Sequence, residues 1–449
     1  MTLSPEALSG ILARHPPAPR YWVAYSGGLD SHVLLHLCAR LQRPGQPPHF
    51  AAVHVHHGLQ PQAEAWAEHC QATCQTEGLP FRLLRVDARA APGESPEEAA
   101  RKARYRALAA LLCPGETVLT AHHRDDQAET LLLQLVRGAG LAGLAGMPAR
   151  GVLGPGWLLR PLLEFSRAEL RAYAEAERLR WIEDPSNENL AYDRNFIRER
   201  VLPLIRTRWP RAEQSISRAA QHCAEAQELL AALGRERCRS ARHPARPTLQ
   251  VERLRALPAP ERRLAVREWL RGAGLRPPSS RVLEQILHSG LDAGPNRNPV
   301  IRWRAGEVRR YRDELYLLPP TGPFDAGAVI PWDGRSVLRL PDGNGELTAV
   351  PVQGPGIAPA RWEKGAITVR YRHGGETCQP VGRPGARELK KLFQEAGIPP
   401  WVRERTPLIY IDNRLAAVGE WWICEAAAGA AGERNVAVRW RAPAWCTGI

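Results

Sequence analysis

The residues from Tyr21 to Ser31 combine a short apolar run, a glycine pair and the start of a helical pattern. Tyr21–Tyr25 is typical of a buried strand, and apolar residues recur at helical spacing after Ser31. Two glycines let the backbone approach an anion, and the free N–H groups of a first helical turn favour negative charge. The stretch is therefore a candidate phosphate-binding loop, made of Ser26, Gly27, Gly28, Leu29, Asp30 and Ser31.

A carboxylate, that of Asp30, stands inside this loop, where a pure anion site would not carry one. Its presence makes sense if a divalent cation sits on the phosphates. The loop has no lysine, so the ordinary nucleoside-triphosphate loop with its Gly-Lys-Ser or Gly-Lys-Thr ending is excluded. A structural alternative stays open, in which Asp30 or Ser31 caps a helix and the glycines only make a turn.

A second dense group of polar residues, His122 to Thr130, follows the strand pattern 117–121 and leads into the helical segment 131–136. Asp126 and Glu129 stand three residues apart, so they project from one helical face. Two carboxylates at a helix start are also stabilised by the helix dipole, which is the structural alternative. Their functional use would be to hold a cation, either a substrate ammonium group or magnesium.

Two groups of arginines have spacings that bring them together. Arg101, Arg104 and Tyr105 share one face of a predicted helix. On spacing alone, a solvated basic face paired with nearby glutamates is the favoured interpretation of this group. Arg194 and Arg198 stand four residues apart and can point one way into a cleft, although such a pair by itself is also typical of an ordinary solvated face.

These residues need a scaffold, and the chain alternates strand and helix patterns. Strand patterns cover 21–25, 50–59, 81–87 and 117–121, and helix patterns cover 61–77, 96–112 and 167–178. The alternation predicts an α/β fold with a parallel, doubly wound, Rossmann-like sheet. Ligands of such sheets bind at the carboxyl ends of strands, where the Ser26–Ser31 loop and the His56-His57-Gly58 turn both stand.

Resident metal chemistry has little support beyond Asp30. His54 and His56 share a strand face, but no cysteine or carboxylate completes a ligand set. The nine cysteines stand singly, with Cys70 and Cys74 the closest pair, and no Cys-x-x-Cys occurs. Their odd number and scatter fit a reducing cytosol.

The bulk numbers describe a globular protein of several domains with a polyanionic partner. A chain of 449 residues is long enough for two or three domains, and 44% hydrophobic with 24% charged residues excludes disorder. The net charge of +14 and the pI of about 9.8 favour a polyanionic partner. No stretch of 18 apolar residues and no signal-peptide pattern occur, so we expect no membrane contact and a cytoplasmic location.

Three domains are expected along the chain. Residues 1–207 carry the candidate site. Residues 208–320 read as mostly helical, with a strand-like alternation of arginine and aromatic residues from 297 to 318. Residues 321–449 read as a small, mainly β domain that contains one short basic helix ending at Gly397.

The motifs together resemble a known family. The loop matches the Ser-Gly-Gly-x-Asp-Ser signature of the PP-loop ATP pyrophosphatases at all of its fixed positions. Residues 122–130 resemble the His-x-Asp-Asp-Gln-x-Glu-Thr motif of the tRNA(Ile)-lysidine synthetases, and 194–198 resemble their Arg-Asn-x-Ile-Arg segment. The stretch 374–422 is similar to the C-terminal domain of the longer members. The resemblance is weak through the middle domain.

The resemblance implies a reaction in two steps. ATP with Mg²⁺ binds over Ser26–Ser31, and the C2 oxygen of the wobble cytidine attacks its α-phosphate, releasing pyrophosphate. The cytidine belongs to tRNA(Ile) with a CAU anticodon. The ε-amine of free L-lysine then displaces AMP and forms lysidine. Asp30 would hold magnesium in this scheme.

The other polar residues receive roles from the same resemblance. Arg104, Arg194 and Arg198 would stabilise phosphoryl and base oxygens as charge develops. Asp126 and Glu129 would hold the lysine amines, and one of them would act as the base, because an ammonium group must lose a proton before it attacks. Nucleotide contacts near His54–His57 are expected by analogy with the family.

Two other functions compete with this interpretation. A tRNA thiolase of the same ATP group would deliver sulfur, but the lack of paired cysteines argues against it. A non-catalytic tRNA-binding protein is disfavoured by the intact loop and by Asp126 and Glu129. The family often works as a homodimer, although the sequence contains no heptad repeat or large apolar stripe that would predict a dimer here.

Overall fold

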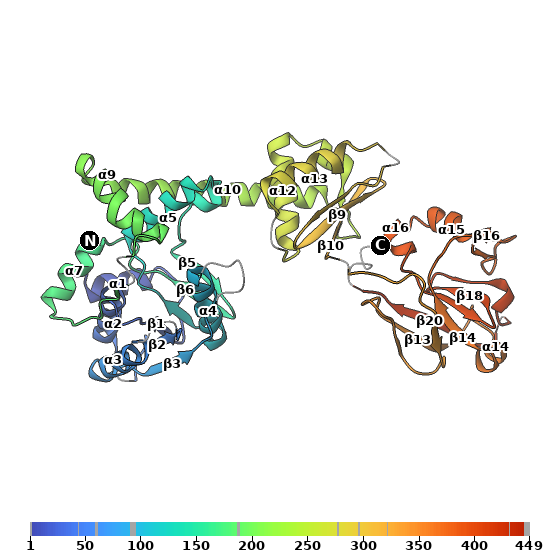
Figure 1. Ribbon diagram of the computed structural model, residues 1–449, viewed down its shortest axis with the longest axis horizontal. Coiled ribbons are helices and arrows are strands. Elements are labelled where there is room, and N and C mark those ends of the chain that lie inside the picture. Colours follow the sequence, from blue (N-terminus) through green and yellow to red (C-terminus); the bar gives the residue numbers. More distant parts are fainter. Residues whose placement is uncertain are drawn as a thin grey trace. The chain divides into compact units, whose positions relative to one another are not determined.

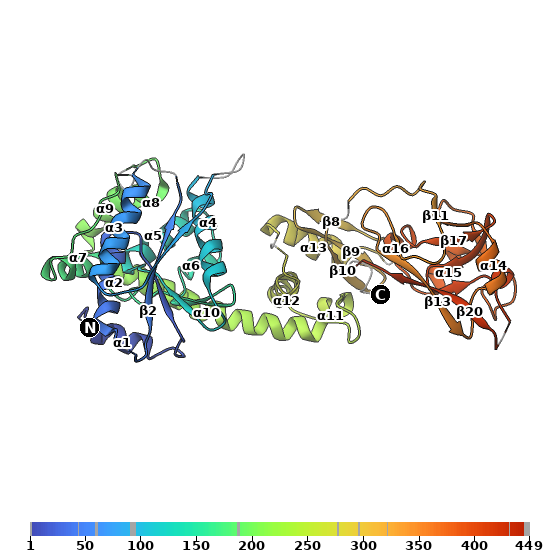
Figure 2. The ribbon, with the colours of Figure 1, turned by 90° about the horizontal axis from the view of Figure 1, so that it is seen from below.

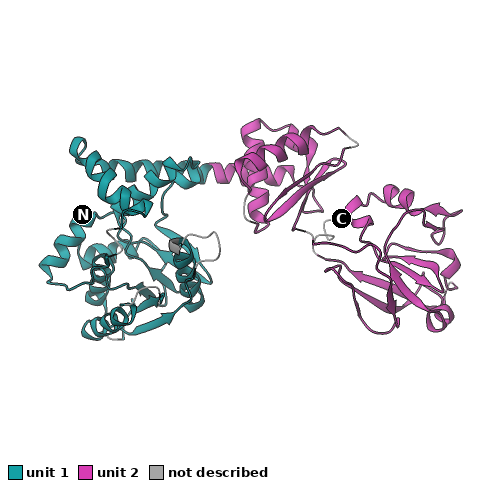
Figure 3. Ribbon diagram, viewed as in Figure 1, with its two compact units in different colours: residues 1–229 teal, residues 230–449 magenta. Residues whose placement is uncertain are grey.

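The computed structural model describes residues 2–43, 45–58, 62–89, 96–185, 189–275, 278–294, 297–320, 322–430 and 432–443. The chain divides into two compact units, residues 1–229 and 230–449 (Figure 3). In the described part of the chain, no helix is both long enough and apolar enough to cross a membrane.

The first unit is built on a six-stranded sheet whose order is β3-β2-β1-β4-β6-β5. Five strands run parallel, and β5 pairs antiparallel with β6 at one edge. The strands are β1 (Tyr21–Ala24), β2 (Phe50–His56), β3 (Phe81–Arg85), β4 (Thr117–Leu119), β5 (Arg150–Leu153) and β6 (Gly156–Leu159). The predicted α/β parallel sheet is confirmed. The order reverses between β1 and β4, which is where open α/β sheets bind ligands.

Helices cover both faces of this sheet (Figures 1 and 2). Side chains of β1 alternate between two cores: Val23 packs on one face with residues of α1, α2, α3 and α7, and Trp22 packs on the other with α4. The helices in these two cores are α1 (Pro5–Leu12), α2 (Leu29–Leu41), α3 (Ala63–Thr76), α4 (Pro96–Leu111) and α7 (Arg167–Ala176). The helix α5 (Arg124–Val136) follows β4 and packs against residues 197–202. The doubly wound arrangement therefore follows the alternation of strand and helix patterns.

Two features of this unit differ from the sequence expectation. The hairpin β5–β6 was not predicted, because its short strands contain Gly151 and Gly156, which weaken a strand pattern. The helix α5 begins at Arg124 rather than at Leu131, so the polar cluster lies on the helix itself. The glycine-rich stretch after α5 contains a short helix, α6 (Leu141–Leu144).

The segment that follows α7 brings Arg194 and Arg198 to the site. It consists of α8 (Asp193–Phe196), a π-helical turn (Ile197–Val201), α9 (Leu202–Arg208) and α10 (Ala212–Ala241), the last of which crosses the boundary between the units. A π-helical turn is rare, and such turns occur often at functional sites. Residues 186–188, which precede this segment, lie outside the described residues.

The second unit begins with helices packed on a four-stranded sheet of order β7-β10-β9-β8. These elements are β7 (Leu249–Gln250), α11 (Val251–Arg255), α12 (Ala259–Gly272), α13 (Ser280–Asp292), β8 (Val300–Trp303), β9 (Gly306–Tyr311) and β10 (Glu314–Leu318). The predicted helical region is confirmed, and the arginine and aromatic alternation from 297 to 318 forms antiparallel strands.

The rest of the second unit is mainly β, as expected. Its sheets have the orders β11-β14-β17-β18-β19, β12-β13-β20 and β15-β16. The elements are β11 (Ile330–Trp332), β12 (Leu338–Arg339), β13 (Glu346–Gln353), α14 (Pro359–Lys364), β14 (Ile367–Arg370), β15 (Thr377–Cys378), β16 (Arg387–Glu388), α15 (Leu389–Glu395), α16 (Pro400–Arg403), β17 (Leu408–Ile411), β18 (Arg414–Val418), β19 (Trp422–Ile423), a 3₁₀ turn (Glu425–Ala427) and β20 (Arg434–Arg441). The predicted boundaries at 207/208 and 320/321 stay a prediction.

One pair of cysteines departs from the scattered arrangement expected from the sequence. Cys378 and Cys424 form a disulfide across 46 residues of chain. The fold of the C-terminal region brings the two together, and their spacing in sequence carries no sign of it. Cys70 and Cys74, the closest pair in sequence, remain free and buried.

Candidate active site

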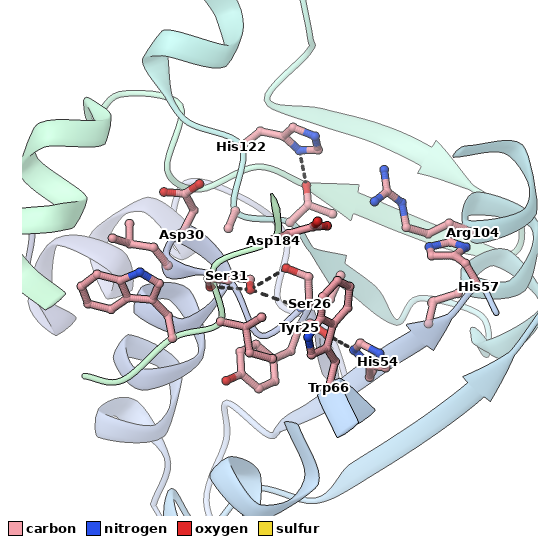
Figure 4. A pocket seen from close by; sticks show the side chains of 18 of the residues that line it. Tyr25, Ser26, Asp30, Ser31, His54, His57, Trp66, Arg104, His122 and Asp184 are labelled. Carbon is pink, nitrogen blue, oxygen red and sulfur yellow. Dashed lines mark hydrogen bonds between the residues drawn. The ribbon is translucent and has the colours of Figure 1, made fainter. Parts of the chain in front are cut away.

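A cavity of about 740 Å³ opens at the carboxyl ends of β1, β2 and β4 in the first unit (Figure 4). All of its lining residues belong to that unit. The predicted site residues among them are Ser26, Gly28, Leu29, Asp30, Ser31, Arg104, Asp126 and Arg198. The sheet therefore brings the glycine loop and the second polar cluster to one place, as strand ends of a parallel sheet should.

The loop after β1 depends on Gly27. Its φ of +87° lies in the region that side chains disfavour, and a Cβ there would come within 2.6 Å of Ile182 Cδ1. The backbone of residue 182 is also tied to the loop, because its N–H donates to the Gly27 carbonyl at 2.9 Å. The segment 181–184 thus holds the loop from one side.

Ser31 organises the loop and does not cap the helix. Its hydroxyl donates to the Gly28 carbonyl at 2.9 Å and accepts from the Ser26 N–H at 3.2 Å. The N-cap of α2 is Gly28, with no side-chain capping bond, so the alternative in which Asp30 or Ser31 acts as the cap is wrong. Because the first N–H groups of a helix have no partner within it, they remain as donors for an anion here.

Asp30 lies in the first turn of α2 and points into the cavity (Figure 4). Its Oδ2 is 3.5 Å from His123 Nε2, and its Oδ1 is buried with no hydrogen-bond partner among the described residues. His123 is 1% exposed and also lies 3.4 Å from Asp126 and 3.7 Å from Asp125. Burial opposes protonation of this histidine, but the carboxylates outweigh it and raise the pKa of His123 to about 10.

Asp126 stands at the start of α5, where its Oδ2 accepts from the His123 N–H at 3.0 Å. Burial raises the pKa of this carboxyl, but His123, His122 and Arg194 outweigh burial and lower it overall. His122 next to it has the opposite character, because burial lowers its pKa to about 3. Asp126 is thus held ionised at the cavity wall and can meet a cation there.

Glu129 lies one helical turn further along α5 and is fully buried. Arg198 pairs with both of its oxygens, at 2.6 and 3.0 Å, and Arg194 Nε lies 3.1 Å from its Oε2. Burial raises the pKa of Glu129, while the two arginines oppose that shift. In the described part of the chain, Glu129 and Arg194 are not among the residues that line the cavity, whereas Asp126 and Arg198 are.

Arg104 and His57 lie beside each other at one end of the cavity, away from Asp30 (Figure 4). Burial, helped by the charge of Arg104, lowers the pKa of His57 to about 4. Arg101 of the same predicted face does not line the cavity; its guanidinium stacks on the Tyr105 ring, with the guanidinium carbon 5.2 Å from the ring centroid. Trp66 of α3 also lines the cavity.

A magnesium ion fits the donors at the loop. Asp30 presents a buried carboxylate oxygen without a partner, next to a helix N-terminus suited to phosphate. The described residues contain no group of three or more His, Cys, Asp or Glu that could hold a metal ion. A single carboxylate, that of Asp30, beside a phosphate-binding helix N-terminus suits Mg²⁺, which takes one or two carboxylates and completes its shell with water and substrate phosphates.

Sequence reasoning missed several residues of the site. The sequence shows His123 as part of a motif but carries no sign of its burial between three carboxylates. Arg167 and Arg171 of α7 line the cavity, whereas their sequence pattern predicts only a helix. Their four-residue spacing in the stretch after Ser166 was the available signal, because such a pair projects from one helical face.

The fold and the site define a PP-loop ATP-binding enzyme, and a family model described as a PP-loop domain matches residues 6–205. Models described as the TilS substrate binding domain and the TilS substrate C-terminal domain match residues 249–316 and 367–440. The tRNA(Ile)-lysidine synthase of Methylococcus capsulatus is 49% identical over 426 residues, which cover 94% of this chain and 97% of the relative. That of Coxiella burnetii is 42% identical and covers 94% and 93%. The chain belongs to the tRNA(Ile)-lysidine synthase family.

Proposed function

We propose that the chain is an ATP-dependent ligase that attaches free lysine to C2 of the wobble cytidine of tRNA(Ile) with a CAU anticodon. The cytidine is first adenylated with release of pyrophosphate, and the lysine ε-amine then displaces AMP and leaves lysidine. One observation carries this proposal: the glycine loop of α2 and the charged cluster of α5 line a single cavity. The first suits a nucleotide polyphosphate, and the second suits an amine.

The loop residues hold ATP in this proposal. The backbone N–H groups at the start of α2 receive the phosphates, and Ser26 and Ser31 keep the loop in shape. Asp30 would hold Mg²⁺, which when bound neutralises charge on the leaving pyrophosphate. The turn at His56–Gly58 and Trp66 supply surface for the nucleoside, and Arg104, which lies beside His57, reaches toward the phosphoryl oxygens from the end of the cavity away from Asp30.

Asp126 meets the lysine amine, because its carboxylate is ionised and lies at the cavity wall. The earlier prediction gave Glu129 the same task, and we now propose a different division of work. Glu129 orients Arg198 and Arg194 from behind, and Arg198 alone of these three lines the cavity. Arg198 then stabilises oxygen charge that develops on the α-phosphate or the base.

The polyanionic partner is the tRNA. The net charge of +14 is suited to an RNA backbone, and the second unit, residues 230–449, carries the two regions matched by substrate-domain models. We propose that this unit grips the tRNA body while the first unit performs the chemistry. The enzyme would work in the cytoplasm, where ATP, lysine and tRNA occur together.

Incorporation of labelled lysine tests the proposal. The purified chain is incubated with ATP, Mg²⁺, labelled lysine and tRNA(Ile) with a CAU anticodon, and the initiator tRNA with the same anticodon is the control. We expect label only in the isoleucine tRNA, together with AMP and pyrophosphate in equal amounts. Cleavage of ATP to AMP without label in either tRNA would refute lysine transfer and point to another nucleophile such as sulfur.

A further inference from the structure

Two arginines of α7, Arg167 and Arg171, line the cavity and have no role in the site as described so far. They stand four residues apart on one helix, so their side chains share a face. In the described part of the chain, neither guanidinium makes a hydrogen bond or an ion pair. Arg167 is half-buried and Arg171 is exposed. Two unpaired cations at the wall of a nucleotide cavity are expected to meet an anion there.

The packing of α7 on α2 shows which part of the cavity they reach. His36 Nδ1 of α2 is 3.1 Å from the Tyr173 hydroxyl of α7, and Arg40, four residues later, pairs with Glu177, also four residues later. The two helices therefore run in the same direction and in register. Asp30 lies six residues before His36, and Arg167 lies six residues before Tyr173. The same register therefore places Arg167 next to Asp30 along the two helices.

A second set of contacts gives the same position independently. The backbone N–H of Arg167 donates to Asp125 Oδ2 at 2.9 Å, Asp125 lies 3.7 Å from His123, and His123 lies 3.5 Å from Asp30. The N-terminus of α7 is fixed by a capping box between Ser166 and Glu169. Both routes place Arg167 beside the first turn of α2, the end of the cavity that receives phosphates. Arg171 is one turn further along, and its side chain extends back toward the same end.

We propose that Arg167 and Arg171 bind the β- and γ-phosphates of ATP and then the pyrophosphate that leaves. The proposal deepens the function above and rests on it. The loop of α2 has no lysine, and Asp30, Glu183 and Asp184 add negative charge at the cavity wall. Few fixed cations besides Arg104 and Arg198 therefore face the polyphosphate, and a magnesium ion held by Asp30 would neutralise only part of its charge. The two guanidinium groups supply that charge from a neighbouring helix. A phosphate of the tRNA backbone is the other source of the same chemistry.

Calorimetry on the full-length chain without tRNA or lysine tests the proposal. The ligands are pyrophosphate with Mg²⁺, and AMP. We expect Arg167→Ala and Arg171→Ala each to weaken pyrophosphate binding about 10- to 100-fold, because a hydrogen bond to a charged group is worth about 1.5–3 kcal/mol. AMP binding should not change, since AMP lacks both outer phosphates. Arg171→Lys should recover part of the loss.

The matched control is Arg106→Ala, an exposed arginine of α4 that does not line the cavity. It should leave the dissociation constants of both ligands unchanged, and circular-dichroism melting checks that every variant is folded. A second measurement gives the affinity for tRNA at two salt concentrations. If Arg167→Ala and Arg171→Ala keep pyrophosphate binding but lower tRNA affinity and flatten its salt dependence, the arginines contact the RNA backbone and the proposal is wrong.

These outcomes are separate from the fate of the proposed function. A wild-type chain that binds pyrophosphate, loses it in the two variants, and yet transfers no lysine would keep the anion site and refute lysidine formation. A wild-type chain that transfers lysine, with variants that bind pyrophosphate normally, would refute the anion site alone.

Discussion

Two strand-to-helix junctions meet in the cavity, and they are built in opposite ways. At the junction of β1 and α2, backbone groups do the work: Gly27 has a positive φ, and the Ser31 hydroxyl is used inside the loop. At the junction of β4 and α5, charged side chains build the site: Asp126 contacts His123 and Arg198 of the π-helical turn, and Glu129 pairs with Arg198 and with Arg194 of α8. The first junction can be read from consecutive residues, whereas the second requires the folded chain.

The two junctions are also expected to differ in how much they contribute to the reaction and to the stability of the fold. The loop places one carboxylate, Asp30, in the open cavity and holds its own shape with neutral hydrogen bonds. The α5 junction buries Glu129 completely and balances it with Arg194 and Arg198. Changes at the loop should therefore affect the reaction first, and changes at the α5 junction should affect folding as well.

The largest effect is expected from Asp30→Asn. The substitution keeps the shape of the side chain but removes the charge that would hold magnesium, so pyrophosphate release should fall about 1,000-fold. Melting temperature should change little, because the side chain is one-third exposed and His123 keeps Asp125 and Asp126 beside it when the charge of Asp30 is lost. Asp87→Asn, on an exposed carboxylate paired with Arg89, is the control. If Asp30→Asn releases pyrophosphate at the wild-type rate, Asp30 has no role in the reaction.

A comparable change at the α5 junction should act on folding. Arg198→Ala leaves Glu129 buried with one arginine fewer, at a cost of about 3 kcal/mol, the lower part of the range for broken buried pairs because Arg194 remains. Hydrogen exchange of α5 amides measures the loss locally. The double variant Glu129→Gln, Arg198→Ala should recover much of it. Equal stability of the wild type and Arg198→Ala would mean that the pair contributes no net stability.

This variant also has a pH dependence with a definite sign. Burial already raises the pKa of Glu129, and loss of Arg198 raises it further. A carboxyl with a raised pKa binds a proton more readily when folded, so the folded state gains as the pH falls. The stability deficit of Arg198→Ala should therefore shrink from pH 8 toward pH 5, whereas Glu129→Gln, Arg198→Ala should show no such trend.

The backbone of the loop is tested by Gly27→Ala. A Cβ at φ +87° is strained and would meet Ile182 at 2.6 Å and Cys70 at 3.2 Å. We expect a loss of about 1–2 kcal/mol in unfolding free energy. We also expect about a tenfold rise in the KM for ATP, because residues 181–184 line the cavity. Gly78→Ala has a similar positive φ but open space around it, so it should cost stability without changing the KM. An unchanged KM for ATP in Gly27→Ala would mean that the loop does not contribute to ATP binding.

The sequence predicts the loop junction between β1 and α2 better than it predicts the junction between β4 and α5. The strand, the glycine turn and α2 come from neighbouring residues with strong local preferences, and the sequence showed all of them. The pairing of Arg198 with Glu129 spans 69 residues, and it depends on a π-helical turn that no spacing rule anticipates. Side-chain burial is likewise a property of the packed chain. The two oxygens of Glu129 face guanidinium groups, which is why we propose a supporting role for it; its predicted contact with lysine stays a prediction.

The placement of Arg167 illustrates why such residues escape sequence reasoning. The arginine pair on α7 was visible, but a pair four residues apart is common on solvated helix faces. The register between α2 and α7, fixed by Tyr173 on His36, and the bond from the Arg167 N–H to Asp125 place Arg167 beside Asp30. Contacts between helices far apart in sequence decide this, and single-chain patterns carry no information on register.

The smallest expected effect compares two histidines, one from each junction. His32 on α2 is 5% exposed, and burial lowers its pKa to about 4, whereas carboxylates raise that of His123. In the unfolded chain a histidine has a pKa of about 6.5. Between pH 6.5 and 4 the unfolded state therefore binds more protons at His32, so stability is present above pH 6.5 and is lost as the pH falls, by at most about 1.4 kcal/mol per pH unit.

His32→Gln removes that titration, so its melting temperature should fall less than that of the wild type between pH 7 and pH 5. The variant should be somewhat less stable at pH 7, because the ring packs edge-on against Tyr25 with centroids 5.6 Å apart. The two melting curves should therefore approach each other in acid. Parallel curves over this range would mean that His32 has nearly the same pKa in the folded and the unfolded chain. Burial would then not be what distinguishes the histidine of the loop junction from the one held among carboxylates at α5.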